Sequence, residues 1–444
     1  MHASEISPSK TPIPSKLPVL MITHSSHHVG GGSLSTKFLL EGIDQAQFDY
    51  SIACIFPNAD LVRLYELPGV RSFYWPGISL FSHTTGEWYS LGNPFDILRL
   101  LKNLYHFWPS VRATEKLVRS EKAPVVHVNS LSLVPSAIGV KRAGAKLVWH
   151  VRESVHPGHF GLRRFLVRSL VMRLADEVIF IAEDNRKQLV DHAKGVVIPE
   201  PVEEDRYHPD VDGKGVRREL GLSPSDRVLL FMGGMSRIKG APVLLKTLQE
   251  VRRHLPELKV IIASGLAPQS ASRIARLARK ILPLLGAGTE RQIFTRLYTE
   301  GKMEEYVTLL PFRNDPERLI AASDLVVFPS TEPHFGRPVV EAGAMAKPVV
   351  ASRIGGVEEA VEEEATGLLV PPNDPVKLAE AILRVLTDPS LARRLGMGGY
   401  KRYQERYQSQ LSTRATEEVY RRVLAAAPSE RSKEGSSAKD ERHE

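Results

Sequence analysis

The sequence predicts an α/β protein with two doubly wound domains, each built around a parallel sheet. Its 444 residues are too many for one ordinary hydrophobic core and suit two domains. Short apolar runs alternate with helical patterns along most of the chain, which is typical of parallel α/β construction. This alternation occurs twice, with a polar segment between the two series.

The first domain is expected over residues 18–205. Its strands are predicted at Val19–Thr23, Tyr50–Phe56, Val125–Asn129, Lys146–Val151 and Glu177–Ile181. Helices are predicted at Leu34–Glu41, Phe95–Arg119 and Leu162–Ala175. Short apolar strands separated by longer helical patterns indicate a doubly wound, Rossmann-like domain.

The second domain is expected over residues 206–407, and the polar segment Val202–Gly215 suits an interdomain linker. Its strands are predicted at Val228–Met232, Lys259–Ser264, Val307–Leu310, Leu325–Pro329, Pro348–Ala351 and Gly367–Val370. Helices are predicted at Ala241–His254, Pro316–Ala322, Val339–Ala346 and Pro375–Thr387. Residues 266–303 are long for a connection within such a sheet and are expected to form an inserted helical pair.

Composition predicts how the two ends of the chain behave. Residues 1–17 and 427–444 are polar, charged and poor in aromatic residues, so we expect disordered tails. A helix at 408–426 is expected to pack back on the first domain. No apolar run approaches the roughly 20 residues of a membrane-spanning helix, and the N-terminus does not resemble a signal peptide. With Cys54 as the single cysteine, we expect a cytoplasmic protein.

The net charge of +8 either favours anionic partners or serves solubility, and both interpretations stay open. Two basic runs interleave aliphatic residues at near-helical spacing: Arg163, Arg164, Arg168 and Arg173 in the first domain, and Arg273, Arg276, Arg279 and Lys280 in the insertion. Such helices can lie on an anionic membrane, which would give a peripheral contact with its inner face. The alternative is that both apolar faces pack inside the protein. Nucleic acid is not an expected partner, because no aromatic-basic recognition motif occurs.

Glycines precede a predicted helix in each half of the chain. Gly30–Gly32 follow the first strand, and Gly233–Gly234 follow the first strand of the second domain. Glycine lets a ligand approach the backbone, and amides at a helix start attract anions. Arg237 and Lys239 add two cations where a diphosphate would bind. The alternatives are a tight turn without a ligand and a solvated basic loop.

The segment His334–Ser352 carries the most specific pattern. Phe335 and Gly336 are expected at a turn between a strand and a helix, with Glu341 in the first two turns of that helix. A carboxylate there can accept hydrogen bonds from two neighbouring hydroxyls, as on a ribose. For Glu341 taken alone, plain solvent exposure explains the residue better.

This segment resembles the donor-site signature of the family-4 retaining glycosyltransferases (glycosyl transferases group 1), which have the GT-B fold. The resemblance extends from Val19 to Leu424. It includes the glycine loop, the strand end Trp149–Glu153, Lys239–Gly240, the run Ala322–Ser330 and the pattern Thr366–Val370. It implies two Rossmann-like domains that face each other across a cleft, with the acceptor on the first and the donor on the second.

The resemblance also implies a role for each matching residue. Lys239 matches the lysine that binds the donor diphosphate, and Glu341 matches the glutamate that holds the ribose hydroxyls. His150 matches the histidine that projects from the first domain toward the sugar. The remaining candidates are the backbone of Phe335, Gly336, Arg337 and Pro338, which would meet the hexose, and Gly31 and Gly32, which would lie near the diphosphate or acceptor.

The implied activity is transfer of a hexose from a nucleotide-sugar donor to a glycan or lipid-linked acceptor, with retention of anomeric configuration, as in polysaccharide biosynthesis. The nucleotide-sugar is a co-substrate, and no other cofactor is expected. No metal is expected either: Asp210–Asp212 lies in the linker without a strand, and His24, His27 and His28 lack a completing Cys or carboxylate. A nucleotide-sugar epimerase and a non-catalytic sugar-nucleotide-binding protein remain as alternatives.

The spacing of two glutamates departs from the family pattern. Glu332 and Glu341 have eight residues between them, one more than in the family, and Pro333 occupies the aligned position. Glu332 stays a candidate catalytic residue beside His150 and Lys239, provided that a bulged turn brings it to the sugar.

The position of an arginine departs as well. Arg237 stands two residues before Lys239, whereas the family arginine stands further upstream, where this chain has Gly234. Either Arg237 or Arg337 is therefore expected to supply the second cation of the donor site.

Overall fold

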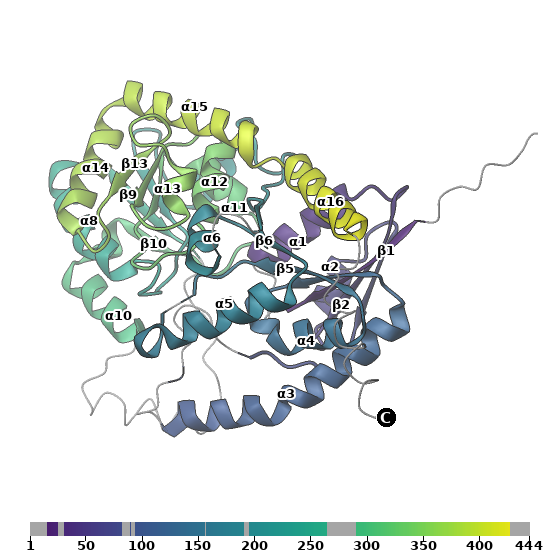
Figure 1. Ribbon diagram of the computed structural model, residues 1–444. Helices are drawn as coiled ribbons and strands as arrows, with labels where there is room; N and C mark the ends of the chain where they lie inside the picture. The colour runs from purple at the N-terminus through teal and green to yellow at the C-terminus, as the bar shows by residue number, and fades with distance from the viewer. Residues whose placement is uncertain are drawn as a thin grey trace, which may run out of the picture.

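The computed structural model describes residues 16–24, 31–81, 89, 94–155, 157–190, 195–263 and 290–426. Two parallel sheets form in this part of the chain, each covered by helices (Figure 1). The predicted fold class of two doubly wound α/β domains is therefore confirmed. Gly30, residues 266–289 of the predicted insertion and nearly all of both predicted tails lie outside the described residues.

The first sheet has the strand order β3-β2-β1-β4-β5-β6-β7. Its strands are β1 (Leu17–Thr23), β2 (Phe48–Cys54), β3 (Val70–Tyr74), β4 (Val125–Asn129), β5 (Lys146–Val151), β6 (Glu177–Phe180) and β7 (Val196–Val197). Its helices are α1 (Gly31–Gly42), α2 (Ala59–Leu64), α3 (Pro94–Glu121), α4 (Val134–Arg142), α5 (Leu162–Leu174) and α6 (Glu183–Leu189). The order reverses at β1, between β2 and β4, and ligands bind at such a reversal in doubly wound folds.

The second sheet has the order β10-β9-β8-β11-β12-β13. Its strands are β8 (Arg227–Phe231), β9 (Leu258–Ile262), β10 (Val307–Leu309), β11 (Leu325–Phe328), β12 (Val349–Ser352) and β13 (Leu368–Val370). The helices of this domain are α7 (Lys214–Glu219), α8 (Ala241–His254), α10 (Glu290–Glu300), α11 (Pro316–Ala322), α12 (Arg337–Ala344), α13 (Val357–Ala360), α14 (Pro375–Thr387) and α15 (Pro389–Arg406).

Strands of the first sheet are covered on both faces, which explains their largely apolar sequences. Val126 and Val128 of β4 pack in the core on one face, whereas Val125 packs in the core on the other. Successive residues of a strand point to opposite faces, so both sets must be apolar. His127 and Asn129 are the buried polar residues of this strand, and both are hydrogen-bonded.

The last described helix, α16 (Ser409–Ala425), returns to the first domain and packs against α1, β4 and β5 (Figure 1). Val419 and Tyr420 are buried in the same core as Tyr50 of β2. Glu417 accepts a hydrogen bond from the Asp44 amide at 2.7 Å. The end of the chain therefore contributes directly to the core behind the first sheet.

The chain crosses between the domains twice, and the two crossings touch each other. The Val202 amide donates to the Tyr407 carbonyl at 3.1 Å, and Val202 forms an isolated bridge with Gln408. Tyr207 lies in the segment that was expected to be a polar linker, yet it is buried in the core of the second domain. This segment is therefore a packed part of the domain boundary.

Several element boundaries differ from the sequence-based expectations. The elements that were not predicted are strands β3 and β7 and helices α2, α4, α6, α7, α13 and α15. Helix α1 begins at Gly31, so Gly31 and Gly32 form its first turn rather than a preceding loop. Helix α12 begins at Arg337, two residues before the predicted start. Among the helices of the described residues, none is both long enough and apolar enough to cross a membrane.

Candidate active site

A cavity of about 410 Å³ lies between the two domains. Met232 and Ala263, which follow β8 and β9, form part of its wall, so it lies at the carboxyl edge of the second sheet. Doubly wound folds bind their ligands at this edge. The cavity is lined by Gly31, Leu34, Arg206, Tyr207, Met232, Lys239, Ala263, Phe312, Arg313, Asn314, Pro316, Leu319, Phe335, Arg337, Pro338 and Glu341.

Lys239 is held by the connection between β8 and α8. Gly240 caps α8 with φ 83°, and a Cβ at this position would lie 1.8 Å from the Pro329 carbonyl oxygen, so only glycine fits. The Ser330 hydroxyl donates to the Ile238 carbonyl at 2.7 Å. These contacts tie the connection after β8 to the one after β11 and fix the position of Lys239.

Lys239 differs from the other cations of the cavity in having no carboxylate partner. Within the described residues, Arg206 pairs with Glu317 at 2.7 Å, Arg313 with Glu219 at 2.5 Å and Arg337 with Glu341 at 2.8 Å, and no ion pair includes Lys239. Burial lowers the pKa of the Lys239 ammonium to about 8. A half-buried cation without a counterion favours the binding of an anion.

Helix α12 brings Arg337 and Glu341 together inside the protein. Gly336 is its N-cap and Pro338 lies in its first turn, where proline is favoured because its missing N–H is not needed. Arg337 Nε donates to Glu341 Oε1 at 2.8 Å, one helical turn away, and both side chains are buried. Burial raises the pKa of the Glu341 carboxyl, and the Arg337 guanidinium opposes this shift.

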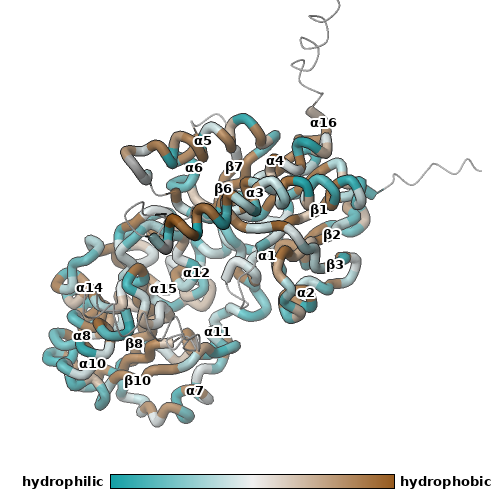
Figure 2. The backbone as a smooth tube through the Cα atoms, turned by 90° about the horizontal axis from the view of Figure 1, so that it is seen from below, coloured by the Kyte–Doolittle hydropathy of each residue, from teal (hydrophilic) through white to brown (hydrophobic). Residues whose placement is uncertain are grey.

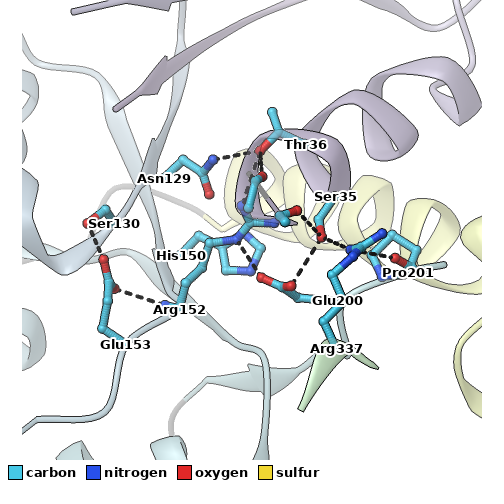
Figure 3. A network of polar contacts seen from close by, with 12 residues as sticks. Ser35, Thr36, Asn129, Ser130, His150, Arg152, Glu153, Glu200, Pro201 and Arg337 are labelled. Atoms are coloured by element: carbon cyan, nitrogen blue, oxygen red, sulfur yellow. Dashed lines mark hydrogen bonds and ion pairs between the residues drawn. The ribbon is translucent and has the colours of Figure 1, made fainter. Parts of the chain in front are cut away.

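Arg337 also crosses the domain boundary. Its Nη1 donates to the Ser35 hydroxyl at 2.5 Å and to the Pro201 carbonyl at 3.2 Å (Figure 3). A Cβ on Gly31 would lie 3.0 Å from Arg337 Cδ, so glycine at the start of α1 makes room for the arginine. The Arg337 Nη2 atom is buried and has no hydrogen-bond partner among the described residues. Arg337 therefore links both domains and keeps unused donor capacity.

Glu200 and Arg152 support this crossing from the first domain. Glu200 Oε2 accepts from the Ser35 hydroxyl at 3.1 Å, and Glu200 Oε1 lies 3.3 Å from Arg152 Nε. Arg152 Nη1 donates to the Gly32 carbonyl at 2.7 Å. The network thus connects the first turn of α1 to the end of β5 and to the domain crossing. Sequence reasoning did not identify Ser35, Glu200 or the part played by Arg152.

His150 lies at the end of β5, beside Arg152 and Glu200 in Figure 3. It does not line the 410 Å³ cavity. Its Nδ1 is 3.1 Å from His127 Nε2, and its Nε2 is buried without a partner among the described residues. Burial, with the Arg152 guanidinium as a smaller cause, holds the pKa of His150 well below its usual value, so the imidazole is neutral.

Arg237 and Glu332 line a different cavity, of about 740 Å³, together with Lys246 and Glu290. The Arg237 side chain is exposed, and its amide donates to Glu290 Oε1 at 2.8 Å. His334 Nδ1 donates to the Glu332 carbonyl at 2.8 Å. Glu332 and Lys239 line different cavities.

The structure therefore divides the predicted site residues into three groups. Gly31, Lys239, Phe335, Arg337, Pro338 and Glu341 line one cavity, and Gly32 and Gly336 adjoin it as neighbours of lining residues. His150 lies in the wall of the first domain, and Arg237 and Glu332 line the second cavity. Of the two arginines considered as the second cation, Arg337 is the one that shares a cavity with Lys239.

A second contact between the domains involves Glu359 of α13. Its carboxylate oxygens accept hydrogen bonds from the amides of Glu183 and Asp184, both at 2.8 Å. These amides form the N-terminus of α6, which has no side-chain cap of its own. A carboxylate at a helix N-terminus satisfies free N–H groups and interacts favourably with the helix dipole. Glu359 of the second domain thus caps a helix of the first.

Comparison with known proteins identifies the second domain. Residues 214–402 match the family model described as glycosyl transferases group 1. The second domain is therefore similar to the group 1 glycosyltransferases. A curated relative from Nocardia farcinica, named D-inositol 3-phosphate glycosyltransferase, is 32% identical over 234 residues, which cover 50% of this chain and 48% of the relative. A relative of the same name from Kineococcus radiotolerans is 29% identical over 288 residues, which cover 60% and 62%. The chain thus spans about half the length of the curated relatives it matches.

Solved structures show the same fold for this chain. HepE of Anabaena in complex with UDP has a TM-score of 0.71 at 21% identity, covering 91% of this chain and 99% of that one. Sucrose-phosphate synthase of Thermosynechococcus elongatus has a TM-score of 0.69 at 22% identity, covering 93% and 100%. Together with the two parallel sheets, these likenesses establish the GT-B fold of two Rossmann-like domains.

Proposed function

We propose that this protein is a glycosyltransferase that moves a sugar from a nucleoside-diphosphate sugar to an acceptor, with retention of anomeric configuration and without a divalent cation. The observation that carries the proposal is the cation Lys239, which lines the interdomain cavity and has no carboxylate partner in the described part of the chain. The amides at the start of α8 lie next to it in sequence and add a partial positive charge. This combination suits a diphosphate.

The comparisons support a nucleotide-sugar donor. HepE of Anabaena is described in complex with UDP and with UDP-glucose, and its fold is the fold of this chain. The curated relatives are named for transfer of a sugar to D-inositol 3-phosphate. From these names we infer the class of donor, and we leave the acceptor to experiment.

In the proposed reaction, three side chains of the cavity have distinct tasks. Lys239 and Arg337 stabilise the negative charge that develops on the departing diphosphate, the task that a divalent metal performs in other enzymes. Glu341 accepts hydrogen bonds from the ribose hydroxyls and so orients the donor. The departing diphosphate oxygen takes the proton of the acceptor hydroxyl on the same face of the sugar, so the new bond keeps the configuration of the old one. Glu332, in the neighbouring cavity, is assigned no step.

We also propose that the acceptor is glycosylated at an anionic membrane surface. Leu162, Phe165 and Leu166 of α5 are 57%, 64% and 51% exposed, so these three side chains do not pack inside the protein. Val167 and Val171 of the same helix pack in the core. Hydrophobic and hydrophilic residues alternate along α5 in Figure 2. Helix α3 also exposes Leu98, Leu101, Tyr105 and Trp108. Exposed apolar residues beside arginines are typical of helices that lie at a membrane interface.

The basic run on α5 is smaller than the sequence suggested. Arg163 was expected to belong to a solvated or lipid-facing charge cluster, but it is buried in the protein. Burial lowers the pKa of Arg163 to about 10. Arg164, Arg168 and Arg173 remain partly or fully exposed. The basic residues expected between 273 and 280 lie outside the described residues.

Incubation with a panel of nucleotide-sugars separates the proposed activity from its alternatives. A transferase releases nucleoside diphosphate, an epimerase yields an altered nucleotide-sugar, and a binding protein changes neither. Proton NMR of the first-formed product then reports whether the anomeric configuration is retained. Inversion, or conversion of the donor without release of nucleoside diphosphate, would contradict the proposal.

The membrane contact is tested by co-sedimentation with vesicles of phosphatidylglycerol and phosphatidylcholine at low and high salt. We expect binding to the anionic vesicles at low salt, and weaker binding for the variants Phe165→Ser and Leu166→Ser. Met397→Ser is the matched control, because Met397 is an apolar residue of similar exposure (54%) on α15 of the other domain. Equal binding to neutral and anionic vesicles at low salt, or no binding to either, would argue for a soluble acceptor.

A further inference from the structure

A chain of four buried polar side chains runs from the core beneath α16 to the end of β5. The Tyr50 and Tyr420 hydroxyls are 2.8 Å apart, and the Tyr420 hydroxyl is 2.7 Å from His127 Nδ1. His127 Nε2 is 3.1 Å from His150 Nδ1. This chain of hydrogen bonds connects Tyr420 of α16 with His150, the histidine that the family resemblance places near the sugar.

All four side chains are buried, with exposed fractions of 1% for Tyr50, 0% for Tyr420, 0% for His127 and 6% for His150. Burial, with a smaller contribution from the Arg152 guanidinium, lowers the pKa of His127 to about 3. Both imidazoles are therefore neutral near neutral pH, and each carries a single N–H proton. Burial also raises the pKa values of both tyrosines, so each hydroxyl keeps its proton.

The number of these protons determines which group donates and which accepts in each hydrogen bond. Among the described residues, Tyr50 has one hydroxyl partner, Tyr420. If Tyr50 accepted from Tyr420, its own proton would be buried without an acceptor among the described residues, which is unfavourable. Tyr50 therefore donates to Tyr420, and Tyr420 donates to His127 Nδ1. His127 must then carry its proton on Nε2 and donate to His150 Nδ1.

We propose that this chain of hydrogen bonds fixes His150 as the tautomer with its proton on Nε2. That nitrogen has no partner among the described residues, and it lies at the carboxyl end of β5, where doubly wound folds bind ligands. Tyr420 and His127 are positioning residues, and His150 presents an N–H donor to the ligand. The inference deepens the proposed function: the ligand group that meets His150 is an oxygen with a free lone pair, such as a sugar hydroxyl. His150 in this state donates a hydrogen bond and does not act as a base.

Tyr420→Phe and Tyr50→Phe form a matched pair, because each removes one buried hydroxyl from the same chain. Tyr420→Phe removes the donor to His127 Nδ1, so the tautomer of His127, and with it that of His150, is no longer fixed. Tyr50→Phe leaves the Tyr420 hydroxyl able to donate to His127. We expect turnover to fall roughly tenfold for Tyr420→Phe, with the KM for the donor little changed, and to stay within about twofold for Tyr50→Phe.

The direct readout is ¹⁵N NMR of the protein labelled on its histidine rings, with His150 assigned by comparison with His150→Gln. We expect the proton of His150 on Nε2 in the wild type and in Tyr50→Phe, and a mixture of tautomers in Tyr420→Phe. A wild-type spectrum with the proton on Nδ1 would overturn the inference, even if Tyr420→Phe did not fold. Because this measurement needs no substrate, it can contradict the inference about the tautomer whether or not the proposed function is correct.

Discussion

Arg337 Nε and Glu341 Oε1 are 2.8 Å apart in a buried ion pair that lies at the boundary of the two domains. The same guanidinium donates to Ser35 of the first domain at 2.5 Å. The contact uses one oxygen of the Glu341 carboxylate. Glu341, which we propose to bind the donor, is thus paired with Arg337, which joins the domains, so donor binding and domain contact are expected to depend on each other.

Removing one partner of this pair is expected to destabilise the protein more than removing both. Arg337→Met leaves the Glu341 carboxylate buried without its cation, which costs about 3–5 kcal/mol of unfolding free energy. The double variant Arg337→Met with Glu341→Gln removes the buried charge, so part of this loss is recovered. Thermal or urea unfolding of wild type, both single variants and the double variant measures the coupling. Additive losses would show that the two side chains do not interact energetically.

Glu341→Gln should weaken donor binding while the protein stays folded, because an amide offers a single acceptor oxygen where a carboxylate offers two. The affected quantity is the dissociation constant for the nucleotide-sugar, measured by calorimetry. Because the substitution also alters the pair with Arg337, the affinity for inorganic diphosphate, which has no ribose, serves as the control. A loss of equal size for both ligands would argue against a ribose contact.

Lys239→Met should weaken binding of nucleoside diphosphate by about 1.5–3 kcal/mol, the value of a charge-assisted hydrogen bond. It should also raise the unfolding free energy of the ligand-free protein, because burial of the uncompensated ammonium opposes folding. Arg237→Met is the control, since Arg237 is an exposed cation that lines the neighbouring cavity. An equal effect of the two substitutions on affinity would refute the assignment of Lys239.

The lowered pKa of Lys239 gives this affinity a pH dependence. With a pKa of about 8 in the free protein, most molecules carry the charge at about pH 7 and few carry it at about pH 9. Diphosphate affinity should therefore fall roughly tenfold between these pH values. The effect on stability has the opposite sign: the unfolded state binds more protons between pH 8 and the ordinary lysine pKa of 10.5, so the stability contribution of Lys239 rises with pH in that window. Lys239→Met should remove both effects, and a pH dependence that it retained would belong to another group.

Glu359→Ala should loosen the contact between the domains. The substitution removes the acceptor of two amides at the start of α6, at 2.8 Å each. We expect a larger radius of gyration by small-angle X-ray scattering for the ligand-free variant, with a smaller difference once donor is bound. Glu358→Ala is the matched control, because Glu358 is the exposed neighbour on the same turn. Identical scattering of the two variants would show that Glu359 does not hold the domains together.

Periodicity and turn residues predicted the fold class, because a strand covered on both sides must be an almost continuous apolar run. β4 and β5 have the predicted bounds, as does α8 with its basic last turn. β3 was not predicted, because it lies at the sheet edge and its sequence, Val70–Tyr74, contains partly exposed residues. Helix α15 was not predicted either, since three glycines interrupt its pattern. Two of them, Gly396 and Gly398, pack closely against the backbone of Ala346 and Ala365.

The residues of the site that depend on contacts between distant segments could not be predicted from the sequence. Lys239, Arg337 and Glu341 lie near recognisable turns, so their local motifs identify them. Ser35 and Glu200 are 165 positions apart and acquire their roles only when the crossing segment meets α1. The one local signal for Glu200 is its place between two prolines, which holds the backbone extended at the domain boundary. Tyr420 and His127 are separated by 293 positions, and no local pattern connects them.

The most direct test of the account is release of nucleoside diphosphate from a panel of nucleotide-sugars in the presence of EDTA, with Lys239→Met as the comparison. We expect release of nucleoside diphosphate from at least one donor and a faster rate when an acceptor extract is added. The rate should fall roughly tenfold or more in Lys239→Met. Addition of magnesium or manganese should not raise the rate further. Release that stops completely in EDTA and returns with either metal, or the absence of binding and release for every donor, would contradict it.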